Sequence, residues 1–232
     1  MLVGRKNSTY IQRNFGWTGY CVLGSIGVPY HELSHLITAV IFRHKIREVQ
    51  LFRPVQGRAD GTLGYVDHSW NSKSIYQRIG NFFIGTAPMF FGAGLMFIVL
   101  RIAYPSVFVN VAEISEIPGS LVFAFRNMFM PENLFTVWTL IVLLITVFIC
   151  PYMDMSWEDI KGSTSGAIAL IIVAIILSFI TMLMPPDMIA QVQSVMNTFI
   201  SNYAYALILG LIVSIIMVVL LGILLLIRSK GL

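Results

Sequence analysis

Apolar residues gather into five long segments, which shorter polar stretches separate. Each segment is close to the ~20 residues that a helix needs to cross the hydrocarbon core of a bilayer. The pattern predicts an all-α integral membrane protein with about five transmembrane helices. A shorter apolar stretch at 121–130 is predicted either to lie on the membrane surface or to enter it, which leaves five or six crossings open. The five segments are 17–42, 79–104, 134–151, 163–184 and 203–227.

The connection between the first two segments is polar, basic and rich in residues that favour strands. Residues 48–51 alternate between polar and apolar, 57–61 carry turn residues, and 62–66 are typical of a second strand. This stretch therefore predicts a small β-hairpin within 45–70, between helices 1 and 2.

Composition supports a lipid environment. Only 11% of the 232 residues are charged and 57% are hydrophobic, whereas soluble domains carry about 25% charged residues. These proportions exclude an ordinary cytosolic enzyme and a nucleic-acid-binding module, and they make the lipid bilayer the expected partner. Cys21 and Cys150 both lie in apolar stretches, so no disulfide scaffold is expected.

Positive charge predicts an orientation. With five crossings, the side that holds the hairpin, the 151–162 connection and the C-terminal tail carries ten of the 15 Lys and Arg residues. Because cytoplasmic loops are enriched in Lys and Arg, this side is expected to face the cytoplasm. No clear targeting segment precedes the first apolar run, which favours a prokaryotic plasma membrane.

The first apolar segment contains an HExxH motif, His31-Glu32-Leu33-Ser34-His35. On a helix, residues four apart share a face, so His31 and His35 can bind one zinc ion at about 2.0–2.1 Å. Glu32 lies beside them and can accept a proton from water that zinc activates. Since ionisable groups inside a membrane span are costly, the motif marks a functional site there.

A catalytic zinc site of this kind needs a third protein ligand. Helices 1 and 3 run parallel in the predicted topology, so the end of helix 3, with its acidic residues, lies on the motif's side. Ser156 and Asp159 have the spacing of a helix N-cap, which explains Asp159 as a capping residue that is still able to bind zinc. Asp154 has no capping role. Asp154 and Asp159 are both predicted as candidates, ahead of Glu158.

Other polar residues near the motif have simpler explanations. His44 is predicted to lie beyond the membrane end of the first helix, as an interfacial residue. Asp67 and His68 are possible ligands, but exposed polarity in the hairpin loop accounts for them.

The motif and the acidic cluster resemble the site-2 protease family of intramembrane zinc metalloproteases. In that family, HExxH on one core membrane helix works with an Asp two core helices later. Pro151 and Asp154 keep the family's Pro-x-x-Asp spacing, with Met155 where the family has Gly. The resemblance covers residues 17–161. It implies a protease core in 1–162 and does not explain the two C-terminal membrane helices that the apolar pattern predicts in 163–232.

The resemblance also implies an activity and a substrate class. It implies a zinc endopeptidase that hydrolyses peptide bonds in or near transmembrane segments of membrane proteins or membrane-inserted peptides. A hairpin edge that includes Leu63 and Tyr65 would bind the unwound substrate by strand addition, unless the hairpin is only interfacial. Asn81 would bind substrate backbone or the developing oxyanion, unless it is only a polar residue at a helix end.

Two other function classes remain consistent with the sequence. One is a non-proteolytic metal-binding membrane protein, a sensor or a transporter, on a degenerate protease core. The scarcity of acidic residues inside the spans, where Glu32 stands alone, disfavours transport. The other is a membrane-bound peptidase whose site faces the aqueous phase and cuts soluble tails.

Overall fold

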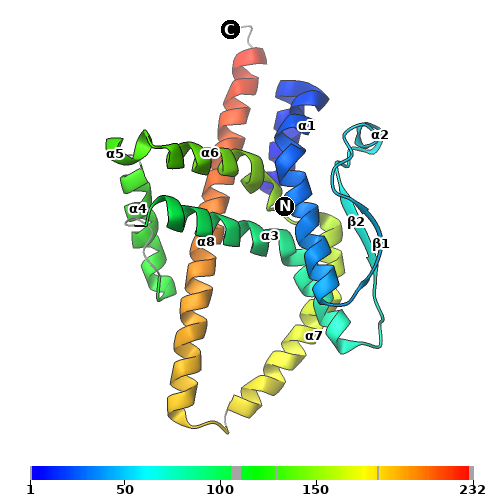
Figure 1. The fold of residues 1–232 in the computed structure, drawn as a ribbon, viewed down its shortest axis with the longest axis vertical. Coiled ribbons are helices and arrows are strands. Elements are labelled where there is room, and N and C mark those ends of the chain that lie inside the picture. The colour runs from blue at the N-terminus through cyan, green and yellow to red at the C-terminus, as the bar shows by residue number, and fades with distance from the viewer. Residues whose placement is uncertain (1, 106–110, 129, 182, 230–232) are drawn as a thin grey trace.

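The chain forms a mostly helical structure with one two-stranded sheet (Figure 1). The computed structural model describes residues 2–105, 111–128, 130–181 and 183–229. In Figure 1 the hairpin lies to one side of α1, whereas α4, α5 and α6 lie on the other. The elements are α1 (Leu2–Ile41), β1 (Lys45–Gln50), α2 (Gly57–Asp60), β2 (Tyr65–Ser69), α3 (Ile75–Ala103), η1 (Ile114–Glu116), α4 (Ile117–Met128), α5 (Pro131–Leu134), α6 (Val137–Ile149), η2 (Cys150–Tyr152), α7 (Trp157–Thr181) and α8 (Pro186–Ser229).

Helix α1 is broken at Gly16, whose φ of 68° and ψ of −170° are not helical. A side chain is strained at this positive φ, so glycine is required for the break. The arm before the break packs against α8, where the Asn14 side-chain amide donates to the carbonyl of Leu221 at 3.0 Å. Ile11 is buried in the same contact.

Helix α1 ends in a Schellman motif that leads into the hairpin. Arg43 has a left-handed φ of 58°, its N–H donates to the carbonyl of Val40 at 3.0 Å, and His44 N–H donates to Ala39 at 2.9 Å. Because two backbone hydrogen bonds hold this turn, the position of His44 relative to α1 is set by the end of the helix.

The predicted hairpin is confirmed, but its second strand begins later than expected. Strands β1 and β2 pair antiparallel, with an irregularity between Ile46 and Glu48. The second strand was expected over 62–66, and β2 occupies Tyr65–Ser69 instead. Asp60 explains the shift, because its carboxylate accepts the Thr62 N–H at 2.9 Å and holds the chain in a turn.

The prediction of five spans is wrong for the described residues, where two helices, α3 and α7, are long and apolar enough to cross a membrane. The first predicted segment falls in α1, where the HExxH residues interrupt the apolar run. The third forms α6, whose 13 residues cover only about 20 Å. The fifth lies within α8, which begins well before it at Pro186. Residues 129 and 182, within two of the predicted apolar stretches, lie outside the described residues.

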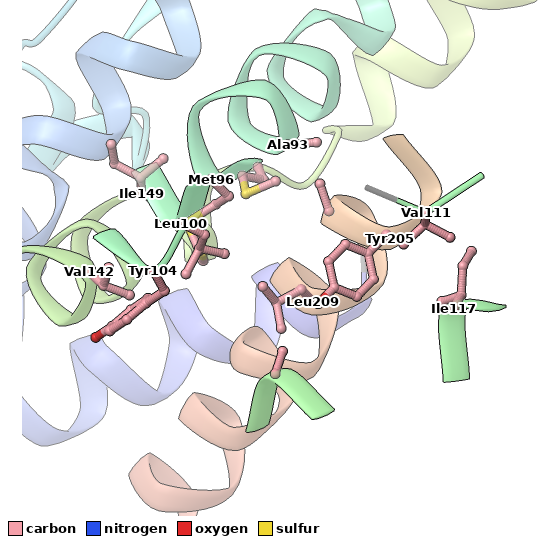
Figure 2. Packing of buried hydrophobic residues seen from close by; sticks show 14 residues of the cluster. Ala93, Met96, Leu100, Tyr104, Val111, Ile117, Val142, Ile149, Tyr205 and Leu209 are labelled. Atoms are coloured by element: carbon pink, nitrogen blue, oxygen red, sulfur yellow. The ribbon is translucent and has the colours of Figure 1, made fainter. Parts of the chain in front are cut away.

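A buried apolar core joins α3, α6 and α8 (Figure 2). Met96 and Leu100 of α3 are fully buried, as is Tyr205 of α8. Helix α7 packs mainly on α3. The domain boundary expected after residue 162 therefore falls inside α7, a continuous helix that contributes both to the acidic cluster and to the apolar region beyond it.

Candidate metal centre

Three side chains from two helices come together at one point. His31 and His35 lie one turn apart on α1, and Asp159 lies in the first turn of α7. The Nε2 atoms of the two imidazoles are 3.1 Å apart. Asp159 Oδ1 is 3.4 Å from His35 Nε2, and Oδ2 is 4.0 Å from His31 Nε2. Within the described part of the chain, this is the one group of His, Cys, Asp and Glu side chains close enough to hold a metal ion.

Two backbone carbonyls orient the imidazoles. His31 Nδ1 lies 2.6 Å from the carbonyl oxygen of Tyr152, and His35 Nδ1 lies 2.7 Å from that of Ile84. Because a carbonyl oxygen only accepts, each Nδ1 must carry the proton and donate it. Each neutral ring therefore has its lone pair on Nε2, the tautomer that a metal ligand needs.

The spacing of these lone pairs fits a zinc ion. Two lone pairs that face each other at 3.1 Å repel unless a cation lies between them. On a tetrahedral zinc, nitrogens about 2.0–2.1 Å from the metal lie about 3.3 Å from each other. His31, His35 and Asp159 thus provide two nitrogens and a carboxylate, the donor set of a catalytic zinc site with a fourth position open.

Asp159 combines two roles that the sequence left as alternatives. Its Oδ2 accepts the Ser156 N–H at 2.7 Å, and its own N–H donates to Ser156 Oγ at 3.1 Å. This reciprocal pair is a capping box, and it fixes the carboxylate at the start of α7. The other oxygen, Oδ1, faces His35. The cap therefore holds Asp159 in position beside the imidazoles rather than keeping it from them.

Asp154, the other predicted third ligand, does not join the group. It borders the same cavity and interacts electrostatically with His31, but the group that can share one ion contains Asp159. Asp154 lies in the irregular segment between η2 and α7, outside the capped turn. The Pro-x-x-Asp spacing that Asp154 shares with the site-2 protease family therefore does not identify the carboxylate that groups with the histidines.

Glycines bring α7 and η2 close enough to complete the site. A Cβ on Gly85 of α3 would lie 2.4 Å from the carbonyl oxygen of Asp159. A Cβ on Gly27 of α1 would lie 2.1 Å from the carbonyl oxygen of Phe148 and 2.2 Å from the ring of Tyr152. Small residues permit this close approach of helices.

Glu32 lies beside the histidines in a common cavity of about 820 Å³. Its side chain is only 9% exposed. The backbone of Gly64 in the hairpin packs directly on it, since a Cβ there would lie 2.8 Å from Glu32 Cγ. The hairpin thus covers the carboxylate on one side, and the cavity reaches it on another.

The predicted substrate-binding residues all border this cavity, with different surroundings. Asn81 is buried and donates to Ser165 Oγ of α7 at 3.2 Å, so it joins two helices. Leu63 precedes β2, and its side chain is buried in an apolar cluster with α1. Tyr65 lies in β2, and its hydroxyl donates to Glu48 at 2.6 Å.

A second histidine pair was not expected from the sequence. His44 Nδ1 and His68 Nδ1 lie 3.0 Å apart, and His44 Nε2 lies 2.9 Å from the carbonyl oxygen of Gln77. Burial lowers the pKa of both imidazoles, and for His68 the neighbouring His44 lowers it further. His44 lies beyond the end of α1 and is buried, and His68 borders the cavity and is not merely an exposed loop residue. The two are 24 residues apart, so no local pattern indicates the pairing.

Comparison of the chain with protein-family models, with curated proteins and with solved structures gave no match.

Proposed function

We propose that the chain is a zinc-dependent endopeptidase that hydrolyses peptide bonds in or near the membrane-spanning segments of membrane proteins. The observation that carries the proposal is the convergence of two unprotonated Nε2 atoms, 3.1 Å apart, on the carboxylate of Asp159. Glu32 borders the same cavity and supplies the second carboxylate that hydrolysis needs. The resemblance of the HExxH motif to that of the site-2 protease family supports the same conclusion.

The residues have distinct roles in this proposal. Zinc held by His31, His35 and Asp159 would activate a water molecule and polarise the substrate carbonyl. Glu32 accepts a proton from the attacking water as its oxygen bonds to the carbonyl carbon. Glu32 then delivers that proton to the leaving nitrogen as the carbon–nitrogen bond breaks. The carbonyls of Tyr152 and Ile84 hold the imidazoles in the ligand tautomer throughout.

The hairpin supports binding of an extended substrate. The cavity is bordered by 61–66 and His68 but by no residue of β1, so β2 is the strand nearer the candidate metal centre. Each strand of a two-stranded sheet has one unpaired edge. A substrate segment that has unwound can pair with the free edge of β2, beside Tyr65, and so present its carbonyl groups. Asn81 also borders the cavity, where it would bind the substrate backbone or stabilise the oxyanion.

The exposed apolar surface supports catalysis within a bilayer. Helix α7 presents large apolar side chains on its surface, including Ile171, Ile175 and Phe179 at 60%, 52% and 66% exposure. In a soluble protein such a surface would be buried, whereas lipid solvates it. With α3 and α7 as spans, the hairpin side of the molecule carries most of the basic residues. We therefore place the site towards the cytoplasmic side of a prokaryotic plasma membrane.

The experiment that tests the function compares the membrane proteomes of cells with the wild-type chain and cells with Glu32→Gln. The glutamine keeps the shape of Glu32 and removes its ability to accept a proton. We expect uncut membrane proteins to accumulate in the variant and their fragments to be found only with the wild type. Identical proteomes from a zinc-loaded wild type and the variant would instead favour a non-proteolytic metal-binding protein.

A further inference from the structure

The His44–His68 pair forms a hydrogen-bonded chain whose direction the structure determines. His44 Nε2 lies 2.9 Å from the carbonyl oxygen of Gln77, which only accepts, so Nε2 of His44 carries the proton. In the neutral ring, Nδ1 of His44 then has the lone pair. The Nδ1 atom of His68, 3.0 Å away, must therefore carry a proton and donate it. This leaves the lone pair of His68 on Nε2.

Hydrogen bonds to backbone carbonyls hold both residues of the His44–His68 pair in place. The Schellman motif at Arg43 positions His44, and the Gln77 side chain donates to the Arg43 carbonyl at 2.7 Å. On the strand side, Arg47 lies at the irregularity in the β-ladder and donates to the carbonyl of His68 at 3.2 Å. The ring of His68 is thus held by His44, and the backbone of His68 is held by Arg47 of β1.

His68 borders the cavity that contains the candidate metal centre, whereas His44 is buried outside the cavity lining. Because Nδ1 of His68 is bonded to His44, Nε2 is the ring nitrogen that remains to accept a hydrogen bond from a ligand in the cavity. The imidazole also interacts electrostatically with Asp159 and His35, which places it near the zinc ligands without being one of them. A neutral nitrogen acceptor in this place suits a backbone N–H of a bound peptide.

We infer that His68 is a substrate-binding residue, whose Nε2 accepts a hydrogen bond from a backbone N–H of the peptide, and that His44 is a positioning residue which fixes the required tautomer. This inference rests on the proposed function, since it assigns a role within the same site. The substrate would then have two contacts with β2: main-chain pairing along the strand edge, and a hydrogen bond to His68 on the face of the strand. His44 acts only through His68, so the two substitutions differ in their effects.

The tautomers are measurable without a substrate. The chain has only four histidines, so ¹⁵N-histidine labelling of the full-length, zinc-loaded protein gives a spectrum that single substitutions can assign. At pH 7.5 we expect His68 as the Nδ1–H tautomer and His44 as the Nε2–H tautomer. In His44→Phe, we expect His68 to become a mixture of both. An Nε2–H tautomer for His68 in the wild type would overturn the inference.

Binding is tested with two zinc-binding probes, an apolar peptide hydroxamate and acetohydroxamate, of which only the first carries peptide N–H groups. His68→Asn keeps a polar group near Nδ1 but removes the acceptor at Nε2, so we expect the affinity for the peptide hydroxamate to fall about tenfold. Acetohydroxamate affinity and zinc content should not change. His68→Gln places an amide oxygen near Nε2 and should restore most of the lost affinity.

The outcomes separate this inference from the proposed function. Equal peptide hydroxamate affinities in wild type and His68→Asn would overturn the role of His68. An equal loss for both probes would also overturn it, because His68 would then act on the metal centre. Zinc content and acetohydroxamate binding of the wild type report on the metal centre alone, so their absence would count against the proposed function.

Discussion

His31 and His35 direct their Nε2 lone pairs towards each other at 3.1 Å, while their Nδ1 protons are donated to carbonyls on η2 and α3. Neither ring can turn to relieve the repulsion without losing its hydrogen bond to the backbone. A cation bound between the rings would relieve this repulsion. Asp159 supplies the negative charge that a divalent cation requires.

The choice of third ligand gives the first prediction. Asp159→Asn keeps an oxygen that can cap α7 but removes the anionic ligand, so zinc affinity should fall by more than about 100-fold. Asp154→Asn is the matched control and should leave zinc affinity within about threefold, well below the loss of about 10–100-fold expected when a residue that orients a metal ligand is removed. Zinc titration with a competing chelator measures both. Loss of zinc from the Asp154 variant alone would reverse the assignment.

The glycine contact between α3 and α7 gives a second prediction. In Gly85→Ala, the new Cβ meets the backbone oxygen of Asp159, which moves only if α7 moves. We expect a loss of about 1–3 kcal/mol in unfolding free energy and weaker zinc binding. Gly94→Ala on the same helix is the control, because no atom lies within 4 Å of its Cβ position. Equal effects of the two substitutions on zinc affinity would show that the contact does not position Asp159.

Removal of zinc should lower thermal stability. A ligand at 100 times its Kd stabilises the folded state by about 2.7 kcal/mol, which corresponds to about 5–10 °C in Tm for a chain of this size. Chelation should lower Tm by this amount in the wild type and leave Asp159→Asn unchanged. A shift of the same size in that variant would mean that zinc binds elsewhere in the chain.

The His44–His68 pair, of which His44 is buried, predicts a pH dependence of the hairpin. Burial lowers the pKa of His44 in the folded state below its ordinary value of 6.5, so the unfolded state binds more protons at acidic pH. Stability is therefore fully present above about pH 6.5 and decreases as the pH falls from there through the folded-state pKa. Hydrogen exchange of β1 and β2 amides, corrected for intrinsic rates, should show faster opening at pH 5 than at pH 7.5.

His44→Phe provides the control for this pH dependence. Phenylalanine fills a similar volume and does not titrate, so the difference between pH 5 and pH 7.5 should shrink in the variant. His68 faces Arg47, Asp67 and Asp159 as well as His44. Its own titration should account for the pH dependence of opening that remains in the variant. An unchanged pH difference in His44→Phe would show that another group controls the opening.

Local patterns predicted part of this structure. The HExxH spacing placed His31 and His35 on one helix face, and alternation predicted the hairpin, because both signals lie within a few residues. The choice between Asp154 and Asp159 was not predictable, since it depends on how closely α7 approaches α3 at Gly85. The number of spans was overestimated because apolar content does not reveal that α6 is short, and because the HExxH residues interrupt the apolar run in α1.

The pairing of His44 with His68 could not be predicted from the sequence, for a related reason. It depends on the Schellman turn at Arg43 and on the register of the ladder, which opposes Ile46 to His68. A shift of one residue in that register would turn His68 to the other face of the sheet. The second strand was expected three residues too early, so the face of His68 was not determined.

The most direct test of the account is cleavage of a reconstituted membrane-spanning peptide by the zinc-loaded wild type and by Glu32→Gln at equal zinc content. We expect the wild type to produce two fragments whose masses sum to that of the peptide plus one water. The variant should be slower by about 10²–10⁴-fold, the usual contribution of a general base. Equal rates for the two proteins, or an intact peptide with zinc-loaded wild type, would contradict the proposed function.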